Sequence, residues 1–271
     1  MTGVPRSGTT WLARELAAAR GAALPGKEPM NPRPGQFGLG GTLPGWSVLE
    51  QPTGRQAALL RRVYRGREPR TLSRYGVKQW SAALPWTTTV VKDPFALLSV
   101  PAIVRVTSAV AVIVFRHPGA VLASYRRMGW TAGTGEIRRL QRLPADPEPQ
   151  DDVAAMAEFW TWMHRQVLGW VDDVPGCLLV DHAELSLAGP AGLAALRSAA
   201  GLRPARVRPA PVAVPVGMPA GGGGLHRFDR APEEVAQGWR ARLTAAEAEL
   251  LDNSETTETY LALQRRRFRS T

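Results

Sequence analysis

The sequence contains a single cysteine, Cys177, in 271 residues. One thiol cannot form an internal disulfide, so the chain is neither a disulfide-stabilised secreted scaffold nor a cysteine-rich zinc module. No apolar run approaches the ~20 residues that a helix needs to cross a bilayer. The N-terminus also lacks the basic and apolar segments of a signal peptide. We therefore expect a soluble, cytoplasmic protein with no membrane span.

Acidic residues are scarce as well, since 23 Asp and Glu stand against 34 Lys and Arg, a formal net charge of +11. A positive excess favours anionic partners, which include nucleic acids, phosphate-bearing cofactors and acidic membranes. The chain has no recognition-helix, zinc-finger or RRM pattern, so we expect no nucleic-acid partner. Hydrophobic residues make up 44% of the chain, which is ordinary for a globular protein.

Segments typical of strands and of helices alternate along the chain. Apolar or β-branched runs at residues 87–92, 110–115 and 177–180 predict strands, and the second has the composition of a strand buried on both faces. Apolar residues recur at helical spacing over 153–171. A second helix is predicted over 232–251, where Pro232 suits a first turn and Gly238 weakens the pattern.

Two stretches rich in Gly and Pro interrupt this alternation, at about residues 25–47 and 203–224. Loops of that length inside a domain are usually functional or act as linkers. No repeat and no clean boundary divides the chain, so we expect one α/β domain over residues 1–271, with a central parallel sheet covered by helices. Ligands in such folds bind beyond the carboxyl ends of the strands.

A glycine-rich loop opens the chain, where residues 3–10 read GVPRSGTT and precede a helical segment. The P-loop pattern G-x-x-x-x-G-K-[ST] fits this loop except that Thr9 occupies the lysine position. Glycines let the backbone approach an oxyanion, the helix N-terminus supplies N–H donors, and Arg6 adds a positive charge. The alternative is a plain Gly-Ser turn that caps a helix.

A second candidate loop follows the apolar strand. Arg116 comes at the end of this strand, Pro118 suits a helix start, and Ser124 lies eight residues after Arg116. The early turns of that helix can bring the hydroxyl back beside the guanidinium, an arrangement suited to a phosphate. The alternative is an arginine at a sheet edge and a serine within an alanine-rich helix.

PRSGTTWL and the Arg-x7-Ser pair together resemble the cofactor motifs of sulfotransferases that use 3′-phosphoadenosine 5′-phosphosulfate (PAPS). VVKDP, LLVDHAELS and GLHRFDRAPEEVAQGW resemble further segments of that family. The resemblance implies a P-loop-like three-layer fold and transfer of a sulfuryl group to a hydroxyl of a small metabolite or glycan, without a metal. Only four residues precede Pro5, so we expect either a very short first strand or a misassigned start.

The same resemblance implies roles for individual residues. The 5′ end of PAPS would bind at the first loop, with Trp11 near the adenine, and the 3′-phosphate would bind at the second loop and under the late segment. The implied cofactor-binding residues are Arg6, Ser7, Gly8, Thr9, Thr10, Trp11, Arg116, Ser124 and Arg227.

The proton acceptor is also implied by resemblance. Phenol-type members use a histidine after the strand that corresponds to residues 87–92, where this chain has Lys92 and Asp93. Heparan-type members use a glutamate in a G-K-E segment beyond the phosphate loop, which matches Glu28. We expect Glu28 to be the base, Lys92 and Arg6 to face the transferring group, and Asp93 to be the second candidate base.

Four tryptophans are candidates for the acceptor pocket: Trp46, Trp80, Trp86 and Trp130. The four histidines have no metal-ligand spacing, so we expect no metal site. The competing function is that of a P-loop kinase-like, nucleotide-dependent phosphotransferase. Thr9 in the lysine position argues against it.

Overall fold

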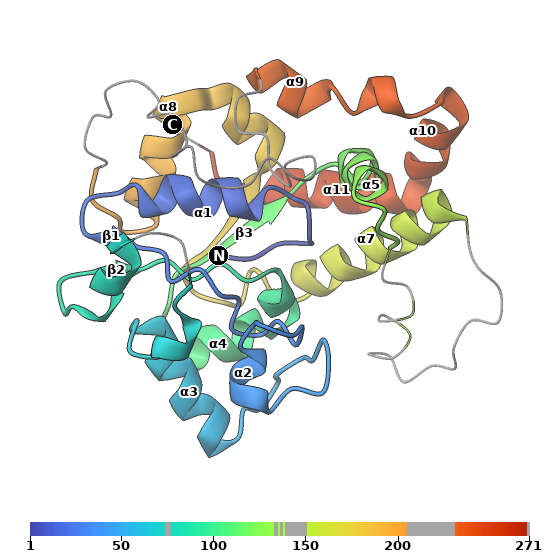
Figure 1. The fold of residues 1–271 in the computed structure, drawn as a ribbon. Coiled ribbons are helices and arrows are strands. Elements are labelled where there is room, and N and C mark those ends of the chain that lie inside the picture. Colours follow the sequence, from blue (N-terminus) through green and yellow to red (C-terminus); the bar gives the residue numbers. More distant parts are fainter. Residues whose placement is uncertain (74–76, 133–134, 136–137, 139–150, 205–230, 270–271) are drawn as a thin grey trace.

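The computed structural model describes residues 1–271 except 74–76, 133–134, 136–137, 139–150, 205–230 and 270–271 (Figure 1). Most of the second Gly- and Pro-rich stretch, 203–224, therefore lies outside the described residues. Arg227, expected near the 3′-phosphate, lies outside them too. The first such stretch, 25–47, is irregular as predicted, apart from one short helix.

The described chain is an α/β structure in which helices predominate (Figure 1). Its α-helices are α1 (Thr9–Ala17), α2 (Gly38–Gly41), α3 (Gly54–Tyr64), α4 (Val100–Thr107), α5 (Pro118–Arg127), α7 (Asp152–Leu168), α8 (His182–Ala199), α9 (Pro232–Gln237), α10 (Ala245–Leu251) and α11 (Ser254–Arg266). Its 3-10 helices are η1 (Pro69–Thr71), η2 (Val77–Ala83), η3 (Pro94–Ser99) and η4 (Arg240–Arg242).

The strands form two small parallel sheets among the described residues. β1 (Ala22–Ala23) pairs with β2 (Thr88–Thr89), and β3 (Ala111–Phe115) pairs with β4 (Cys177–Asp181). The strands predicted at 110–115 and 177–180 are confirmed. The strand predicted at 87–92 is confirmed only in its first half, since its second half has no strand assignment.

The first two residues connect the two sheets through backbone hydrogen bonds. Thr2 donates to Val112 O at 2.9 Å and accepts from Val114 N at 2.9 Å. On its other side, Met1 N donates to Val91 O at 2.7 Å, and Met1 O accepts from Asp93 N at 3.0 Å. The chain start thus lies between β3 and the segment after β2, as a very short first strand would.

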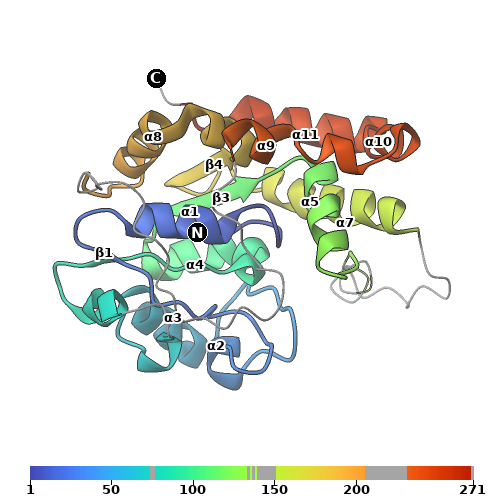
Figure 2. The ribbon, with the colours of Figure 1, turned by 45° about the horizontal axis from the view of Figure 1, so that its top comes forward.

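Helices pack on both faces of the β3–β4 sheet because successive side chains of a strand point to opposite faces. Ile113 and Phe115 pack with Met156 and Trp160 of α7. Val112 and Val114 belong to a second core that contains apolar residues of α1 and α8. In Figure 2, α8 lies next to β4, α1 crosses in front of β3, and α7 lies to the right of both strands.

The predicted helix over 153–171 is confirmed by α7, whereas the single helix over 232–251 is wrong. That region is broken into α9, η4 and α10. Gly238 ends α9, and Thr244 starts α10 with a capping box in which its hydroxyl accepts from Glu247 N. The box at Thr244 begins a new helix, since an N-cap residue has non-helical backbone angles and a helix cannot continue through it.

In the part of the chain that the structure describes, every helix is too short or too polar to span a bilayer.

Candidate functional site

A cavity of about 1090 Å³ lies at the carboxyl ends of the strand segments. Its lining residues form two groups. The strand-end wall consists of residues that follow strands or begin the helices after them: Arg6, Thr9, Thr10, Trp11, Arg116, Ser124, His182 and Ser186. The loop wall is formed by the 25–47 segment together with Lys92: Lys27, Glu28, Asn31, Arg33, Gln36, Trp46 and Lys92.

The glycines of the first loop are required by close contacts. A Cβ on Gly3 would lie 2.2 Å from Val114 O, and a Cβ on Gly8 would lie 2.0 Å from the imidazole Cδ2 of His182. Gly8 also has a φ of 95°, in the left-handed region that favours glycine. The loop can therefore run between β3 and the start of α8 only with glycine at these two positions.

The N-terminus of α1 faces the cavity without a side-chain cap. Its N-cap residue is Gly8, which has no side chain to accept from the first-turn amides, and the first N–H groups of a helix have no acceptor within it. Thr9 and Thr10 line the cavity at this turn. The first-turn amides and the positive end of the α1 dipole are thus directed into the cavity, where they can bind an anion.

Ser7 differs from its neighbours because it is fully buried and does not line the cavity. Its hydroxyl has no hydrogen-bond partner among the described residues. The preceding residue, Arg6, has a φ of 73°, which is uncommon for a side chain with a Cβ. This backbone turns the Arg6 side chain toward the cavity and Ser7 away from it.

Arg6 joins the two predicted loops. Its Nε donates to Ser124 Oγ at 3.0 Å, across 118 residues of sequence. Its guanidinium also lies 5.6 Å from the ring centre of Trp130. The two segments that the sequence selects independently therefore meet at one point.

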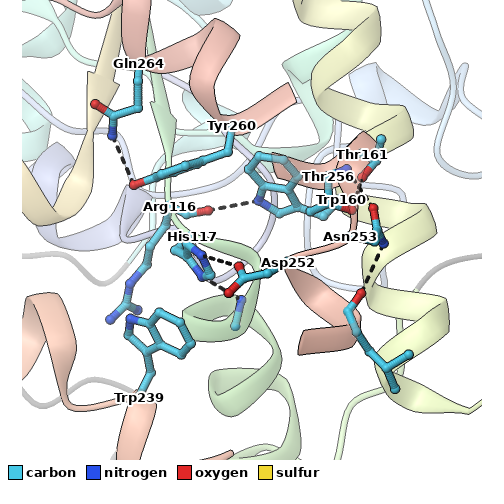
Figure 3. Close-up of polar contacts among 12 residues, drawn as sticks. Arg116, His117, Trp160, Thr161, Trp239, Asp252, Asn253, Thr256, Tyr260 and Gln264 are labelled. Atoms are coloured by element: carbon cyan, nitrogen blue, oxygen red, sulfur yellow. Dashed lines mark hydrogen bonds and ion pairs between the residues drawn. The ribbon is translucent and has the colours of Figure 1, made fainter. Parts of the chain in front are cut away.

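Arg116 is buried at the end of β3, with 8% of its surface exposed. Its carbonyl accepts from Trp160 Nε1 at 2.9 Å, and its Nη2 donates to Val235 O in α9 at 2.7 Å. Figure 3 shows the side chain extending from this anchored backbone toward Trp239. The C-terminal helices thus cover the guanidinium on the side away from the sheet.

His117, next to Arg116, supports this cover. Its ring stacks on Trp239 with centres 4.3 Å apart, and its Nδ1 accepts from Gly119 N at 3.2 Å to cap α5. Its Nε2 faces Asp252 at 3.6 Å (Figure 3). Burial lowers the pKa of His117 to about 4, although the Asp252 carboxylate opposes the shift. The cap needs the neutral ring, because a protonated Nδ1 cannot accept.

Two residues of the strand-end wall were missed by the sequence analysis, His182 and Ser186. His182 follows β4, is 5% exposed, and contacts the Trp11 ring edge-on with centres 5.2 Å apart. Ser186 lies one turn later and donates to His182 O at 2.7 Å. The available signal was positional, since His182 is the first residue after a predicted strand, where parallel-sheet ligands bind.

The loop wall is centred on an ion pair between Lys92 and Glu28. Lys92 Nζ contacts Glu28 Oε1, and the amide of Asn31 donates to the other carboxylate oxygen. The side chains of Lys92 and Glu28 are only 11% and 13% exposed, yet both line the cavity. The structure therefore brings together a residue of the loop and a residue that follows the β2 segment.

Asp93 has a different environment from Glu28. It is 1% exposed and does not line the cavity. Its carboxylate accepts from the backbone N–H of Met30 and, at 2.9 Å, from that of Phe95. Burial, with a contribution from the negative charge of Glu28, raises the pKa of Asp93 to about 7. Through its hydrogen bond from Met30 N, Asp93 fixes the backbone of the loop wall without itself facing the cavity.

Aromatic rings flank the loop wall. Arg33 lies over the rings of Phe95 and Trp130 at 5.8 and 5.4 Å. Of the four tryptophans expected around an acceptor, Trp46 and Trp130 line the cavity. Trp80 and Trp86 do not line it and are 66% and 70% exposed elsewhere.

The cavity lining is strongly positive. Its basic residues are Arg6, Lys27, Arg33, Lys92, Arg116 and Arg127, and among the lining residues Glu28 is the sole carboxylate. In the part of the chain that the structure describes, no group of three or more His, Cys, Asp or Glu gathers to hold a metal. The lining suits an anionic ligand, and the volume exceeds the roughly 300–1,000 Å³ of ordinary small-molecule pockets.

Comparison with models of protein families, with curated proteins and with solved structures finds no match to this chain.

Proposed function

We propose that the chain is a PAPS-dependent sulfotransferase that moves a sulfuryl group to a hydroxyl of a small metabolite or glycan. One observation carries the proposal: a single cavity is lined by the uncapped α1 N-terminus with Arg6, by the buried Arg116 and by Ser124, and by the Lys92–Glu28 pair. The first two groups are suited to a nucleotide with anions at both ends, and the third to proton removal from an alcohol.

The strand-end wall has the chemistry that PAPS requires. Arg6 and the amides of Thr9 and Thr10 would hold the 5′-phosphosulfate, and Arg116 with Ser124 the 3′-phosphate. Trp11 and His182 offer ring surfaces for the adenine. When bound, PAPS supplies the sulfuryl group and a stable leaving phosphate. The positive lining reduces the cost of bringing so many negative charges into one cavity.

The loop wall provides the acceptor side. With PAPS bound, Glu28 would accept the proton of the acceptor hydroxyl, and Lys92 would hold a positive charge beside the reacting oxygens. Glu28 suits this role better than Asp93, since Glu28 lines the cavity while both Asp93 oxygens are occupied by backbone amides. Trp46 and Trp130 would contact the acceptor.

The backbone hydrogen bonds of Met1 and Thr2 support the expected P-loop-like fold. They order the segments as β1, β2, the chain start, β3 and β4. With helices on both faces of β3 and β4, this order is compatible with a three-layer α/β domain whose first strand leads into a phosphate loop.

Thermal-shift titration separates this function from that of a kinase-like phosphotransferase. We expect 3′-phosphoadenosine 5′-phosphate (PAP) to raise the melting temperature more than ATP with Mg²⁺, because only PAP offers a 3′-phosphate to Arg116. Incubation with PAPS and pooled alcohols, read by mass spectrometry, should give products heavier by one SO₃ group.

The same incubation in EDTA tests the metal dependence. We expect turnover to persist in EDTA, since Arg6, Lys92 and Arg116 are placed to meet the donor's charge. Activity that is lost with the chelator and restored by Mg²⁺, or tighter binding of Mg²⁺-ATP than of PAP, would favour the phosphotransferase.

A further inference from the structure

A second surface, distinct from the cavity described above, combines exposed apolar residues with exposed arginines. Its apolar residues are Val77, Trp80, Leu84 and Trp86, which are 87%, 66%, 39% and 70% exposed. All four lie within ten consecutive residues that include η2. Large side chains this exposed and this close in sequence mark an interaction site, since isolated exposed apolar residues are normal but clusters are not.

The arginines lie beside this cluster in a cavity of about 600 Å³. Arg61, Arg65 and Arg67 line this cavity together with Leu84 and Pro85. Gly66 allows the segment that carries these arginines to approach η2, because a Cβ at this position would lie 2.2 Å from Ala82 O. The backbone between Arg65 and Arg67 is therefore packed directly against η2, the 3-10 helix that carries Trp80.

These three arginines have no ion-pair partner among the described residues, although the neighbouring Arg62 and Arg70 both bind Glu68. Among the described residues that line this cavity there is no carboxylate, and Thr87, Thr88 and Thr89 are part of the lining. Residues 51–91 hold eight of the chain's 34 Lys and Arg but one of its 23 Asp and Glu. The segment that carries the exposed tryptophans thus has an excess of positive charge.

We infer that this surface, defined by Arg61, Arg65, Arg67, Val77, Trp80, Leu84 and Trp86, docks on an anionic lipid bilayer. Tryptophan is favoured at the membrane–water interface, where its ring is buried and its N–H stays hydrated. Arginines next to such a cluster are attracted to anionic headgroups. The carboxylate-free cavity gives a headgroup phosphate three guanidinium groups.

The placement leaves the first cavity accessible while the protein is docked. In Figures 1 and 2, β1 and α3 lie on one side of the molecule and α5 and α10 on the other. The second cavity includes Ser108, Ala109 and Val110, which precede β3, whereas the first includes Arg116, which follows it. The two cavities thus lie at opposite ends of the same strand.

Co-sedimentation with lipid vesicles tests the inference. The full chain should bind vesicles of equal parts phosphatidylcholine and phosphatidylglycerol, and should not bind phosphatidylcholine alone. In R61Q/R65Q/R67Q we expect the partition coefficient to fall roughly 100-fold, about fivefold for each arginine. The matched control R242Q/R265Q/R269Q removes three exposed arginines elsewhere and should stay within about twofold, because distant charges are screened.

The tryptophans are tested separately with brominated phosphatidylcholine in the mixed vesicles. Bromine quenches tryptophans that enter the interface, so the wild-type fluorescence should fall and that of W80S/W86S should not. Four results would overturn the inference: no binding to mixed vesicles, an equal loss in the control, unchanged quenching in W80S/W86S, or concentration-dependent self-association without lipid that W80S/W86S abolishes. The last would identify the occupant as a second copy of the chain.

Discussion

The two walls of the first cavity are positioned in different ways. The strand-end wall is attached to regular elements: Arg116 follows β3, His182 follows β4, and Arg6 precedes α1. The loop wall consists of irregular backbone that is held by polar contacts from Lys92 and Asp93. Because the two walls are held by different contacts, one wall can change without displacing the other. A substitution in one wall should therefore leave the properties of the other wall near their wild-type values.

The largest expected effect is at the loop wall, in the substitution Glu28→Gln. The amide keeps the size of the side chain and removes the basicity. General-base catalysis contributes about 10²–10⁴-fold, so turnover with PAPS should fall by that factor. PAP affinity, measured by calorimetry, should stay near the wild-type value because the strand-end wall is unchanged.

Glu50→Gln is the matched control, since Glu50 is exposed and does not line the cavity. It should leave turnover unchanged. If Glu28→Gln retains most of its activity while Asp93→Asn abolishes it, the base is Asp93, and the two walls are not divided by chemistry as proposed.

At the strand-end wall, Arg116→Ala should affect nucleotide binding instead. A charge-assisted phosphate contact contributes about 2–3 kcal/mol, so PAP affinity should fall roughly 30- to 150-fold. Adenosine 5′-phosphosulfate lacks the 3′-phosphate, and its affinity should barely change. Equal losses for both ligands would show that Arg116 holds the wall together rather than binding the 3′-phosphate.

The contrast between the walls also explains what the sequence could predict. Motifs within one loop, such as GVPRSGTT and Arg-x7-Ser, identified the strand-end residues because strand ends bring such loops together. The Arg6–Ser124 hydrogen bond was not predictable, since each residue was assigned to a different phosphate. His182 was missed because an imidazole after a strand has no motif of its own.

For the loop wall, local patterns carried less information. The Lys92–Glu28 contact joins residues 64 positions apart, and family resemblance implied a role for each residue but not the contact between them. Trp80 and Trp86 were grouped with Trp46 and Trp130 because composition does not distinguish an exposed ring from one that lines a cavity. The break at Gly238 was underestimated because helical periodicity persists through a short interruption.

A third prediction tests how far the strand-end wall depends on its cover. A Cβ on Gly119 would lie 2.3 Å from Cζ3 of Trp239. Gly119→Ala should therefore displace Trp239 from His117 and lower the free energy of unfolding by about 1–3 kcal/mol, as overpacking does. Denaturant unfolding measures this, with Gly54→Ala as control because a Cβ there meets open space. Similar free energies of unfolding for the two variants would show that Trp239 can move to accommodate the added methyl group without loss of stability.

The smallest effect concerns the protonation of His117 beneath the same cover. Its pKa is lowered to about 4, against about 6.5 in an unfolded chain, so the native state binds fewer protons than the unfolded state between these values. Stability must then fall as the pH decreases through this window, by about 0.7 kcal/mol from pH 7 to pH 6 for this group.

The substitution His117→Asn tests this contribution. It keeps an acceptor for Gly119 N, since asparagine is a favourable N-cap, and it removes the titrating group. Buried His164 has its pKa lowered in the same way, so the variant should lose part of the wild-type pH dependence and keep the rest. Denaturant unfolding of both proteins at pH 7 and pH 6 measures the difference. An identical pH dependence in the two would mean that His117 titrates normally and that Trp239 does not exclude water from its ring.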